Sequence, residues 1–292
     1  MTAHDIAFLG LGIMGGPMAG WLSKHGHRVK VWNRTNSKAQ AWGQKHQGIV
    51  ATTIADAVKK ADIVIACVGD DPDARAVAEA AYTNMAPGSL YIDHTTTSAH
   101  LAYSLSQATQ ARGIDWMDAP VSGGQAGAMN GRLTAMCGAS NAVFTRAEPI
   151  ISSYCATRVR IGEAGTGQLA KMVNQIAIAG VVQGLAEALA FAQAQMLDTA
   201  AVLAAISKGA AGSWQMDNRW STMAEGKFDF GFAVDWMRKD LRIALEAASA
   251  CGLDLALTKL VDSYYAQIQA EGGGRLDTSS LVKRFTVGVA KP

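Results

Sequence analysis

The sequence lacks the features that mark metalloproteins and nucleic-acid-binding proteins. Its four cysteines form no CxxC pair and no Cys/His cluster with metal-ligand spacing, which predicts buried thiols in a reducing compartment and no metal site. The formal net charge is only +2, and the lysines and arginines are scattered along the chain. Without a basic stripe, nothing predicts binding to nucleic acid or to an anionic membrane. We therefore expect a small-molecule partner.

The chain also lacks a recognisable signal peptide and a convincing membrane span. An apolar, strand-like run begins at Ile6, with no charged segment and apolar core of the secretory type before it. The apolar run 176–192 is interrupted by Gln183 and Glu187 and is rich in alanine and glycine. These patterns predict a cytoplasmic protein with no membrane partner.

The first part of the chain has the rhythm of a parallel sheet with crossover helices. A length of 292 residues with 49% apolar content predicts two domains, each with its own core. Up to about residue 161, short apolar runs alternate with amphipathic helical stretches. The predicted strands are the runs IAFLGLG, RVKVWN, DIVIACVG, SLYIDH, IDWMDAP and LTAMCG.

The second part is alanine-rich and has helical periodicity throughout. The predicted helices are 167–196, 198–209, 231–251 and 255–271, and no segment among them predicts a strand. The glycine-rich stretch 162–168 opens the first of these helices, which places the domain boundary there. The sequence thus predicts an α/β nucleotide-binding domain over residues 1–163 and an all-α domain over residues 164–292.

A glycine motif follows the first predicted strand directly. Gly10, Gly12 and Gly15 form G-x-G-x-x-G between a buried strand and an amphipathic helix. In this context the first glycine permits a tight turn, the second admits a pyrophosphate and the third lets the helix pack on the strand. The motif predicts a dinucleotide site in which the cofactor-binding residues are Gly10, Leu11, Gly12, Ile13 and Met14.

The end of the second predicted strand indicates which dinucleotide is preferred. An Asp or Glu would hold the ribose 2′-hydroxyl of NAD there, but the chain has Asn33, Arg34 and Thr35, followed by Lys38. Arg34 can stack on adenine and, with Thr35 and Lys38, donate to a 2′-phosphate. This favours NADPH, with NADH as a possible second cofactor. The alternative is a solvated loop in which Asn and Ser only cap a helix.

The segment 118–131 is a candidate anion site. It is glycine-rich enough that we expect no helix in it. The consecutive N–H groups of Ser122, Gly123 and Gly124, with the serine hydroxyl, can cradle a carboxylate. A flexible hairpin turn is the alternative.

One lysine stands in the otherwise apolar first long helix. Gln168, Lys171, Asn174 and Gln175 are three and four residues apart and share one face, whereas residues such as Leu169 and Val173 form an apolar face. Lys171 either extends along a hydrated surface or is buried at the domain junction. Burial there would lower its pKa and suit it to proton exchange with an alcohol or carbonyl oxygen.

Together these segments resemble the β-hydroxyacid dehydrogenase family, which includes 3-hydroxyisobutyrate dehydrogenase, tartronate semialdehyde reductase and glyoxylate/succinic semialdehyde reductase. The resemblance extends over nearly the whole chain. It implies a Rossmann-type domain followed by a helical domain whose first long helix carries the catalytic lysine. The motifs that carry it are FLGLGIMGGPMAG, DHTTTS (93–98), DAPVSGG (118–124), GRLTAMCG (131–138), GTGQLAKMVNQ (165–175) and KDLRIAL (239–245).

The resemblance assigns roles to individual residues. It implies that Lys171 is the general acid/base. Ser122, Gly123 and Gly124 would bind the substrate carboxylate, and Asn174, with Gln175 beside it, would orient the substrate. Thr96 and Lys239 match positions on the nicotinamide side of the cofactor.

The chain departs from the family pattern at several positions. Many members have two adjacent asparagines where this chain has Asn174 and Gln175. An asparagine common after the glycine motif is Trp21 here. The usual Met-Leu-Pro after the fourth strand is replaced by 68–70, Val-Gly-Asp, with Val68 as the expected cofactor contact. Trp214 and Trp236 shape the pocket or simply pack.

These observations predict an NADPH-preferring reductase of a small aldehyde or keto acid, reversible as a 3-hydroxyacid dehydrogenase. An imine reductase is the second hypothesis, which Lys171 disfavours. A noncatalytic NADPH-binding sensor or scaffold is a third. The alanine- and glycine-rich faces of the second half predict a homodimer or homotetramer. The particular semialdehyde or hydroxy acid is not identified by the sequence.

Overall fold

The computed structural model describes residues 3–46 and 48–285, and the chain divides into two compact units. The nucleotide unit comprises residues 1–171 and the helical unit residues 172–292. The division falls inside the long helix α8 (Thr166–Ala194), whereas the sequence predicts a boundary after residue 163. The first turns of α8 are grouped with the sheet because their backbone and side chains bond to it, as described below.

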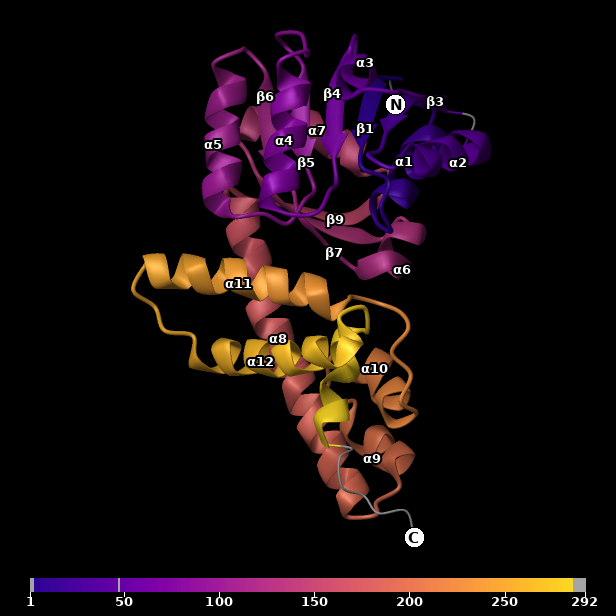
Figure 1. Ribbon diagram of the computed structural model, residues 1–292, viewed down its shortest axis with the longest axis vertical. Helices are drawn as coiled ribbons and strands as arrows, with labels where there is room; N and C mark the ends of the chain where they lie inside the picture. The colour runs from indigo at the N-terminus through magenta and orange to yellow at the C-terminus, as the bar shows by residue number, and fades with distance from the viewer. Residues whose placement is uncertain (1–2, 47, 286–292) are drawn as a thin grey trace. The chain divides into compact units, whose positions relative to one another are not determined.

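In the described part of the nucleotide unit, nine strands form one sheet (Figure 1). The order β3-β2-β1-β4-β5-β6-β8-β7, with β9 beside β8, begins as the doubly wound 3-2-1-4-5-6 arrangement. The strands from β3 to β6 are parallel, and β8 runs antiparallel to β6 and β7. The strand bounds are β1 (Asp5–Leu9), β2 (Arg28–Trp32), β3 (Ile49–Val50), β4 (Ile63–Ala66), β5 (Leu90–Asp93), β6 (Asp115–Asp118), β7 (Val121–Ser122), β8 (Leu133–Gly138) and β9 (Cys155–Gly162).

Helices cover both faces of this sheet, because alternate side chains of each strand point to opposite faces. Ile6 and Phe8 of β1 pack with α1 (Gly15–Lys24), α2 (Asn36–His46) and α7 (Asn141–Ile151). The intervening Ala7 and Leu9 pack with α3, α4 and α5. The bounds of these three helices are Ile54–Val58, Asp71–Tyr82 and Ala99–Gln110.

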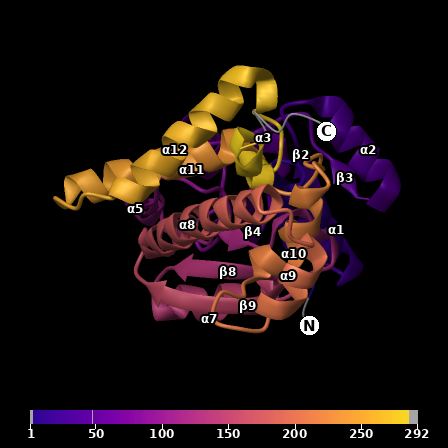
Figure 2. The same cartoon turned by 90° about the horizontal axis from the view of Figure 1, so that it is seen from below.

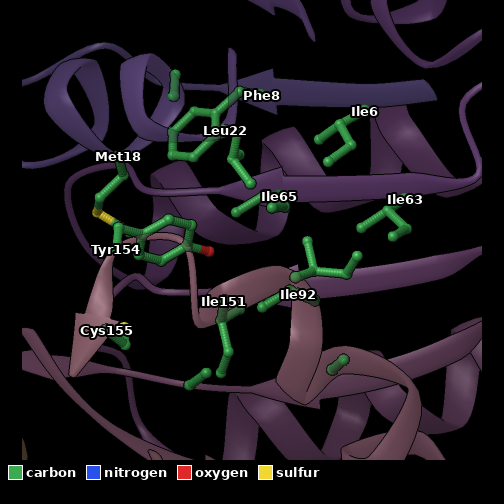
Figure 3. Packing of buried hydrophobic residues seen from close by; sticks show 14 of the residues in the cluster. Ile6, Phe8, Met18, Leu22, Ile63, Ile65, Ile92, Ile151, Tyr154 and Cys155 are labelled. Carbon is green, nitrogen blue, oxygen red and sulfur yellow. The ribbon is translucent and has the colours of Figure 1, made fainter. Parts of the chain in front are cut away.

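Large apolar side chains fill the first of these two layers (Figure 3). Phe8, Met18, Ile65 and Tyr154 are fully buried in it, although they come from distant parts of the sequence. At about 25 cal/mol per Å² of apolar surface removed from water, such layers supply the main stabilisation of the sheet. The site residues at the ends of the strands therefore rest on a well-packed base.

The helical unit contains the rest of α8 and further helices around a separate core. Buried residues of α8, such as Val182 and Leu189, pack with Trp220 and Tyr265. Helices α11 and α12 lie side by side in both views (Figure 2). The bounds are α9 (Thr199–Ile206), α10 (Trp214–Ala224), α11 (Val234–Ala250) and α12 (Ala256–Ile268), followed by a π-helical segment (Gln269–Gly273) and a 3-10 helix (Thr278–Phe285).

The structure confirms the predicted fold class, the six predicted strands and the four predicted long helices, with small shifts of their ends. Two interpretations are wrong. The segment 118–131 contains a short helix, α6 (Gly124–Met129), because only two of its six residues are glycine and Ala128 is buried in the core. The cysteines are not all buried, since Cys251 is exposed just after α11.

Sequence periodicity also missed β9 and α10. Strand β9 lies beside β8 at the margin of the sheet, and its outward positions carry exposed Val159 and Ile161 beside arginines, which blurs the alternation. Helix α10 has its charged and polar residues on the exposed face and buries only Met216, Trp220 and Met223.

Helix α8 is long and apolar enough, by length and composition, to span a membrane, with a mean hydropathy of 1.5 over its best window. A buried helix at the core of a globular unit passes the same test. Here 44% of that window is buried, and Ala179, Val182, Ala186 and Leu189 lie in the core of the helical unit.

The third glycine of the motif provides a test of the strand–helix contact. A Cβ at Gly15 would lie 2.1 Å from the carbonyl oxygen of Gly10, whereas a Cβ at the neighbouring Gly16 would meet nothing within 4 Å. We expect Gly15→Ala to lower the free energy of unfolding by roughly 1–3 kcal/mol through overpacking. Gly16→Ala should leave it unchanged or raise it by up to about 1 kcal/mol, since alanine favours helix. Urea unfolding of both variants checks this, and equal midpoints would contradict the close packing.

Candidate active site

The glycine turn joins β1 to α1 at the carboxyl end of the central strand. Gly10 has φ of +100°, and a Cβ there would lie 2.3 Å from the carbonyl oxygen of Cys67 at the end of β4. Gly12 has no neighbour within 4 Å of an added Cβ. Packing therefore requires glycine at position 10. At position 12 the fold itself imposes no such requirement, which is expected where a ligand approaches the backbone.

The N-terminus of α1 is open to an anion. Helices α3, α4, α5 and α7 each begin with a Thr, Asp or Ser whose side chain accepts a backbone N–H. Among the described residues, no side chain caps α1 in this way, and its first turn has no acidic residue. The glycine turn before α1 and the positive end of the helix dipole suit a phosphate. The glycine turn thus fits the pyrophosphate of a dinucleotide.

The end of β2 is bonded to the glycine turn through Asn33. Its Oδ1 accepts the N–H of Leu11 at 2.8 Å, and its Nδ2 donates to the carbonyl of Thr35. The neighbouring Arg34 is largely exposed and forms an ion pair with Asp73 at 2.9 Å. An exposed pair of this kind contributes little stability. The guanidinium is therefore held near the strand ends but remains accessible to a ligand.

The loops after β4 and β5 are connected by a side-chain hydrogen bond. The N–H of Val68 donates to Oγ1 of Thr95 at 3.0 Å, and the N–H of Thr95 donates to the carboxyl of Asp93. Burial raises the pKa of Asp93 to about 7, against the lowering effect of that hydrogen bond. Thr96 is half-buried between the buried Thr95 and Thr97, so it is the threonine of this segment with access to the surface.

A buried histidine links the same loop to the next strand. Nδ1 of His94 lies 2.6 Å from the carbonyl oxygen of Ala119, and Nε2 lies 2.8 Å from the hydroxyl of Tyr154. The carbonyl can only accept, which assigns the proton to Nδ1 and makes Nε2 the acceptor for Tyr154. Burial lowers the pKa of His94 to about 4, so it is neutral at physiological pH.

The candidate carboxylate loop lies between β7 and α6. Ser122 ends β7 and is half-buried, while Gly123, with φ of +122°, is the N-cap position of α6. A Cβ at Gly123 would also lie 3.2 Å from Leu133. The N–H groups of Gly123 and Gly124 come next in the chain after Ser122, at the N-terminus of α6. No side chain of the described residues caps this helix.

The start of α8 is fixed by a buried carboxylate from the end of β6. Asp118 accepts the N–H of Gly165 on Oδ1 at 2.6 Å and the N–H of Gln168 on Oδ2 at 3.0 Å. Burial raises its pKa to about 6, and these hydrogen bonds oppose that rise. Gly138 and Gly167 surround it so closely that a Cβ at either would lie within 2.8 Å of its carboxylate. Asp118 thus serves as the cap of α8 from another part of the chain.

Lys171 is buried in the same unit. Its side chain is 6% exposed, and Nζ donates to the carbonyl of Val121 at 3.0 Å, one residue before Ser122. The alternative of a lysine lying along a hydrated surface is therefore wrong. Gln168 and Gln175 of the polar face are buried as Lys171 is, whereas Leu169 and Val173 of the apolar face are exposed.

The remaining predicted site residues lie in the helical unit, in one buried network. Nδ2 of Asn174 donates to Oε1 of Gln175, whose Nε2 donates to Asp240 at 2.6 Å. Lys239 forms an ion pair with the other oxygen of Asp240 at 3.1 Å. Gln175 is thus engaged with Asp240 inside the unit. Trp236, one turn before Lys239, is 40% exposed, and Trp214 stacks under the guanidinium of Arg219.

Sequence reasoning assigned no role to Asp118, Asp240 or His94. Two signals were available: an aspartate that ends a buried strand, and an aspartate on an otherwise apolar helix face. Two cavities, of about 360 Å³ beside α5 and about 760 Å³ beside α10, are lined by none of the predicted site residues.

Two family descriptions match the chain in sequence. Residues 5–162 match the "NAD binding domain of 6-phosphogluconate dehydrogenase". Residues 165–285 match the "NAD-binding of NADP-dependent 3-hydroxyisobutyrate dehydrogenase" domain. The two matches follow one another along nearly the whole chain.

Individual relatives are similar over the same length. An uncharacterized oxidoreductase of Shewanella frigidimarina is 51% identical over 96% of this chain and 97% of its own. The 2-hydroxy-3-oxopropionate reductase of Escherichia coli is 33% identical over 95% of this chain and 96% of its own. The structure of Mycobacterium tuberculosis 3-hydroxyisobutyrate dehydrogenase with L-serine superposes with a TM-score of 0.90 and 29% identity, and covers 98% of this chain and 100% of its own.

The buried histidine generates a pH prediction. Because the pKa of His94 is lowered to about 4, the unfolded chain binds a proton at this residue between about pH 6.5 and 4 that the folded chain does not. His94 therefore contributes stability above pH 6.5 that is lost as the pH falls through this window, by at most about 3 kcal/mol.

Asp93 and Asp118, whose pKa values are raised, change stability in the opposite direction over part of the same range, so total unfolding curves mix the effects. NMR of ¹⁵N-histidine-labelled protein isolates His94. We expect its signals to stay those of the neutral Nδ1–H form from pH 8 down to pH 5. A midpoint near 6.5 would contradict the buried network.

Proposed function

The chain belongs to the β-hydroxyacid dehydrogenase family, and from this premise we propose that it transfers hydride reversibly between NADPH and a small semialdehyde or keto acid, with Lys171 as general acid/base. It is an NAD(P)-dependent oxidoreductase acting on a CH–OH group. The proposal adds the roles of individual residues and the preference for NADPH.

One observation carries the assignment of Lys171. A lysine buried in the nucleotide unit has its Nζ on the carbonyl oxygen of Val121, directly before the candidate carboxylate loop that begins at Ser122. An ammonium group carries three N–H donors, so a lysine at this place can also donate to a substrate oxygen. A proton donor and a carboxylate holder adjacent in space orient a substrate that has an oxygen function near its carboxylate.

The residues then divide the chemistry among them. The hydroxyl of Ser122 and the N–H groups of Gly123 and Gly124 hold the substrate carboxylate. Nζ of Lys171 holds the proton, gives it to the developing alkoxide oxygen during reduction and removes it from the alcohol during oxidation. Asn174 orients the substrate, with its amide fixed by Gln175. When bound, the dinucleotide supplies or accepts the hydride at its nicotinamide ring.

The proposed cofactor site lies along the carboxyl ends of the strands. Gly10, Gly12 and the N-terminus of α1 would hold the pyrophosphate, with Leu11, Ile13 and Met14 forming the rest of the turn. Val68, Thr96 and Lys239 would contact the nicotinamide side. Arg34, with Thr35 and Lys38, would bind a 2′-phosphate, and Asn33 holds this corner to the glycine turn. NADPH is therefore the preferred cofactor, and NADH a weaker one.

Two rival functions keep the same fold. An imine reductase is the first of these, and Lys171 disfavours it because the matching position in imine reductases is commonly not a lysine. A noncatalytic NADPH sensor would bind the cofactor without turning over any substrate. An assay with semialdehydes and cyclic imines separates all three.

We also propose a homodimer or homotetramer in the cytoplasm. Large apolar side chains of α8, among them Val173 and Phe191, are exposed in the single chain and would be covered in such an assembly.

The role of Lys171 is tested with a panel of small substrates: succinic, methylmalonic and tartronic semialdehydes and glyoxylate. We expect Lys171→Met and Lys171→Arg to lower kcat by roughly 10²–10⁴-fold, since arginine keeps the charge but does not release a proton at neutral pH. NADPH affinity should change by no more than a few-fold. Lys59→Met, at an exposed lysine of the same unit, serves as the control. Near-wild-type turnover by a folded Lys171 variant would refute the assignment.

The role of Arg34 is tested by the ratio of NADPH to NADH affinity. We expect Arg34→Ala to weaken NADPH binding about tenfold or more, as loss of a charge-assisted phosphate contact implies, and to weaken NADH binding much less, since NADH loses only the stacking on adenine. Asp73→Asn is the matched control, because it breaks the ion pair but keeps the guanidinium. If both variants lose NADPH equally, the ion pair and not the phosphate contact is responsible.

A further inference from the structure

Gln168, in the first turn of α8, makes two hydrogen bonds to the loop after β5. Its Nε2 donates to the carbonyl of Thr95 at 2.8 Å, and its Oε1 accepts the N–H of Thr97 at 3.0 Å. The side chain is fully buried, as are Thr95 and Thr97. One amide thus satisfies a donor and an acceptor on either side of Thr96, an arrangement that fixes both the backbone of the loop and the orientation of the amide.

The place of this loop in the sheet indicates what it faces. In a doubly wound sheet the dinucleotide crosses the carboxyl ends of the strands at the point where the strand order reverses, which here is between β1 and β4. Arg34 and the adenosine side lie at the end of β2. The nicotinamide half must then extend the other way, over the ends of β4 and β5, where Val68 and Thr95 are hydrogen-bonded to each other.

The turn of helix that carries Gln168 is also the turn that positions Lys171. Asp118 accepts the N–H of Gln168 itself as well as that of Gly165. Lys171 follows three residues later, about one helical turn, and bonds to Val121 between β6 and α6. All of these contacts lie within the nucleotide unit.

From this geometry we propose that Gln168 is a positioning residue that fixes the nicotinamide-side loop at Thr95–Thr97 relative to the helix turn bearing the proton donor Lys171. The proposal rests on the proposed function. It implies that the hydride site and the proton donor are placed relative to each other inside the nucleotide unit. Loss of the amide then loosens the nicotinamide end of the cofactor site without affecting the adenosine end.

The test compares two buried glutamines of the same helix. Gln168→Met removes both hydrogen bonds at nearly constant side-chain length. Gln183→Met is the matched control, because Gln183 is also buried and its amide donates to Glu187 on the next turn of α8. Gln168→Glu, which keeps an acceptor for Thr97 but no donor for Thr95 when ionised, is the second variant if Gln168→Met does not fold.

Two readouts are measured on each folded protein. The first is the Kd of NADPH and of its adenosine fragment 2′,5′-ADP, with NADH and ADP as the corresponding pair. We expect the Gln168 variant to weaken the whole dinucleotide roughly three- to tenfold, because the loosened loop must be ordered on binding, and to bind the fragment as wild type does. The second is hydrogen exchange of a peptide containing Thr97 without cofactor, which should be faster in the Gln168 variant and unchanged in Gln183→Met.

Each outcome decides the matter. Equal weakening of dinucleotide and fragment, or the same change in Gln183→Met, would show a general loss of structure and overturn the proposal. Wild-type exchange at Thr97 and wild-type affinity for the dinucleotide in the folded Gln168 variant would also overturn it. If the wild-type protein binds neither dinucleotide, the proposed function fails first and the positioning role fails with it. Wild-type binding with no effect at Gln168 refutes the positioning role alone.

Discussion

The buried carboxylate of Asp118 is the interaction on which the arrangement of the site depends. It sits at the end of β6 and accepts backbone N–H groups from the first turn of α8, 47 and 50 residues further along the chain. A charged group in the interior is costly, and the raised pKa of about 6 expresses that cost. The hydrogen bonds from α8 offset part of it. Folding therefore favours the one geometry in which the helix start and the strand end meet.

The other polar groups of the nucleotide unit build on this contact. Gln168 connects the same turn to the loop after β5, and Lys171 connects the next turn to Val121 of β7. His94 links the loop after β5 to Ala119, beside Asp118, and to Tyr154 in the apolar layer. Because each of these groups is buried and hydrogen-bonded, displacing one leaves another without its partner. The network therefore fixes the loops that the proposed chemistry requires.

The proposed adenosine side of the cofactor site, at the glycine turn and Arg34, is more exposed than the network around Asp118. Helices α3, α4, α5 and α7 begin with a side-chain cap, whereas no described side chain caps α1, and Gly12 leaves space before its N-terminus. Exposed Arg34 forms a solvent-accessible ion pair with Asp73. In the proposed function, the buried polar groups lie at the reacting end and the accessible ones at the adenosine end, which suits hydride transfer, because that step needs precise placement. In the helical unit, Asp240 holds Lys239 and Gln175 in a similar buried arrangement.

The sequence alone determined the features that depend on local chemistry. Alternating apolar runs predicted the strands of the sheet, helical periodicity predicted the long helices, and the glycine spacing placed the turn after β1. The isolated lysine of α8 was also visible, because a charge in an apolar helix is unusual in any fold. Arg34 was recognised for the same reason, as a guanidinium where a carboxylate is expected. Each of these signals lies within a short window of the chain.

Only the tertiary structure decided which polar residues act together. On α8, Leu169 and Val173 of the apolar face are exposed while Gln168 and Gln175 of the polar face are buried, because the partners of those amides come from a loop and a helix up to 73 residues away. The short helix α6 forms in a glycine-rich segment for a similar reason, since burial of Ala128 outweighs weak local propensity. A buried hydrogen bond depends on two groups and the space between them. The sequence names the groups, and only the fold brings them within 3 Å of each other.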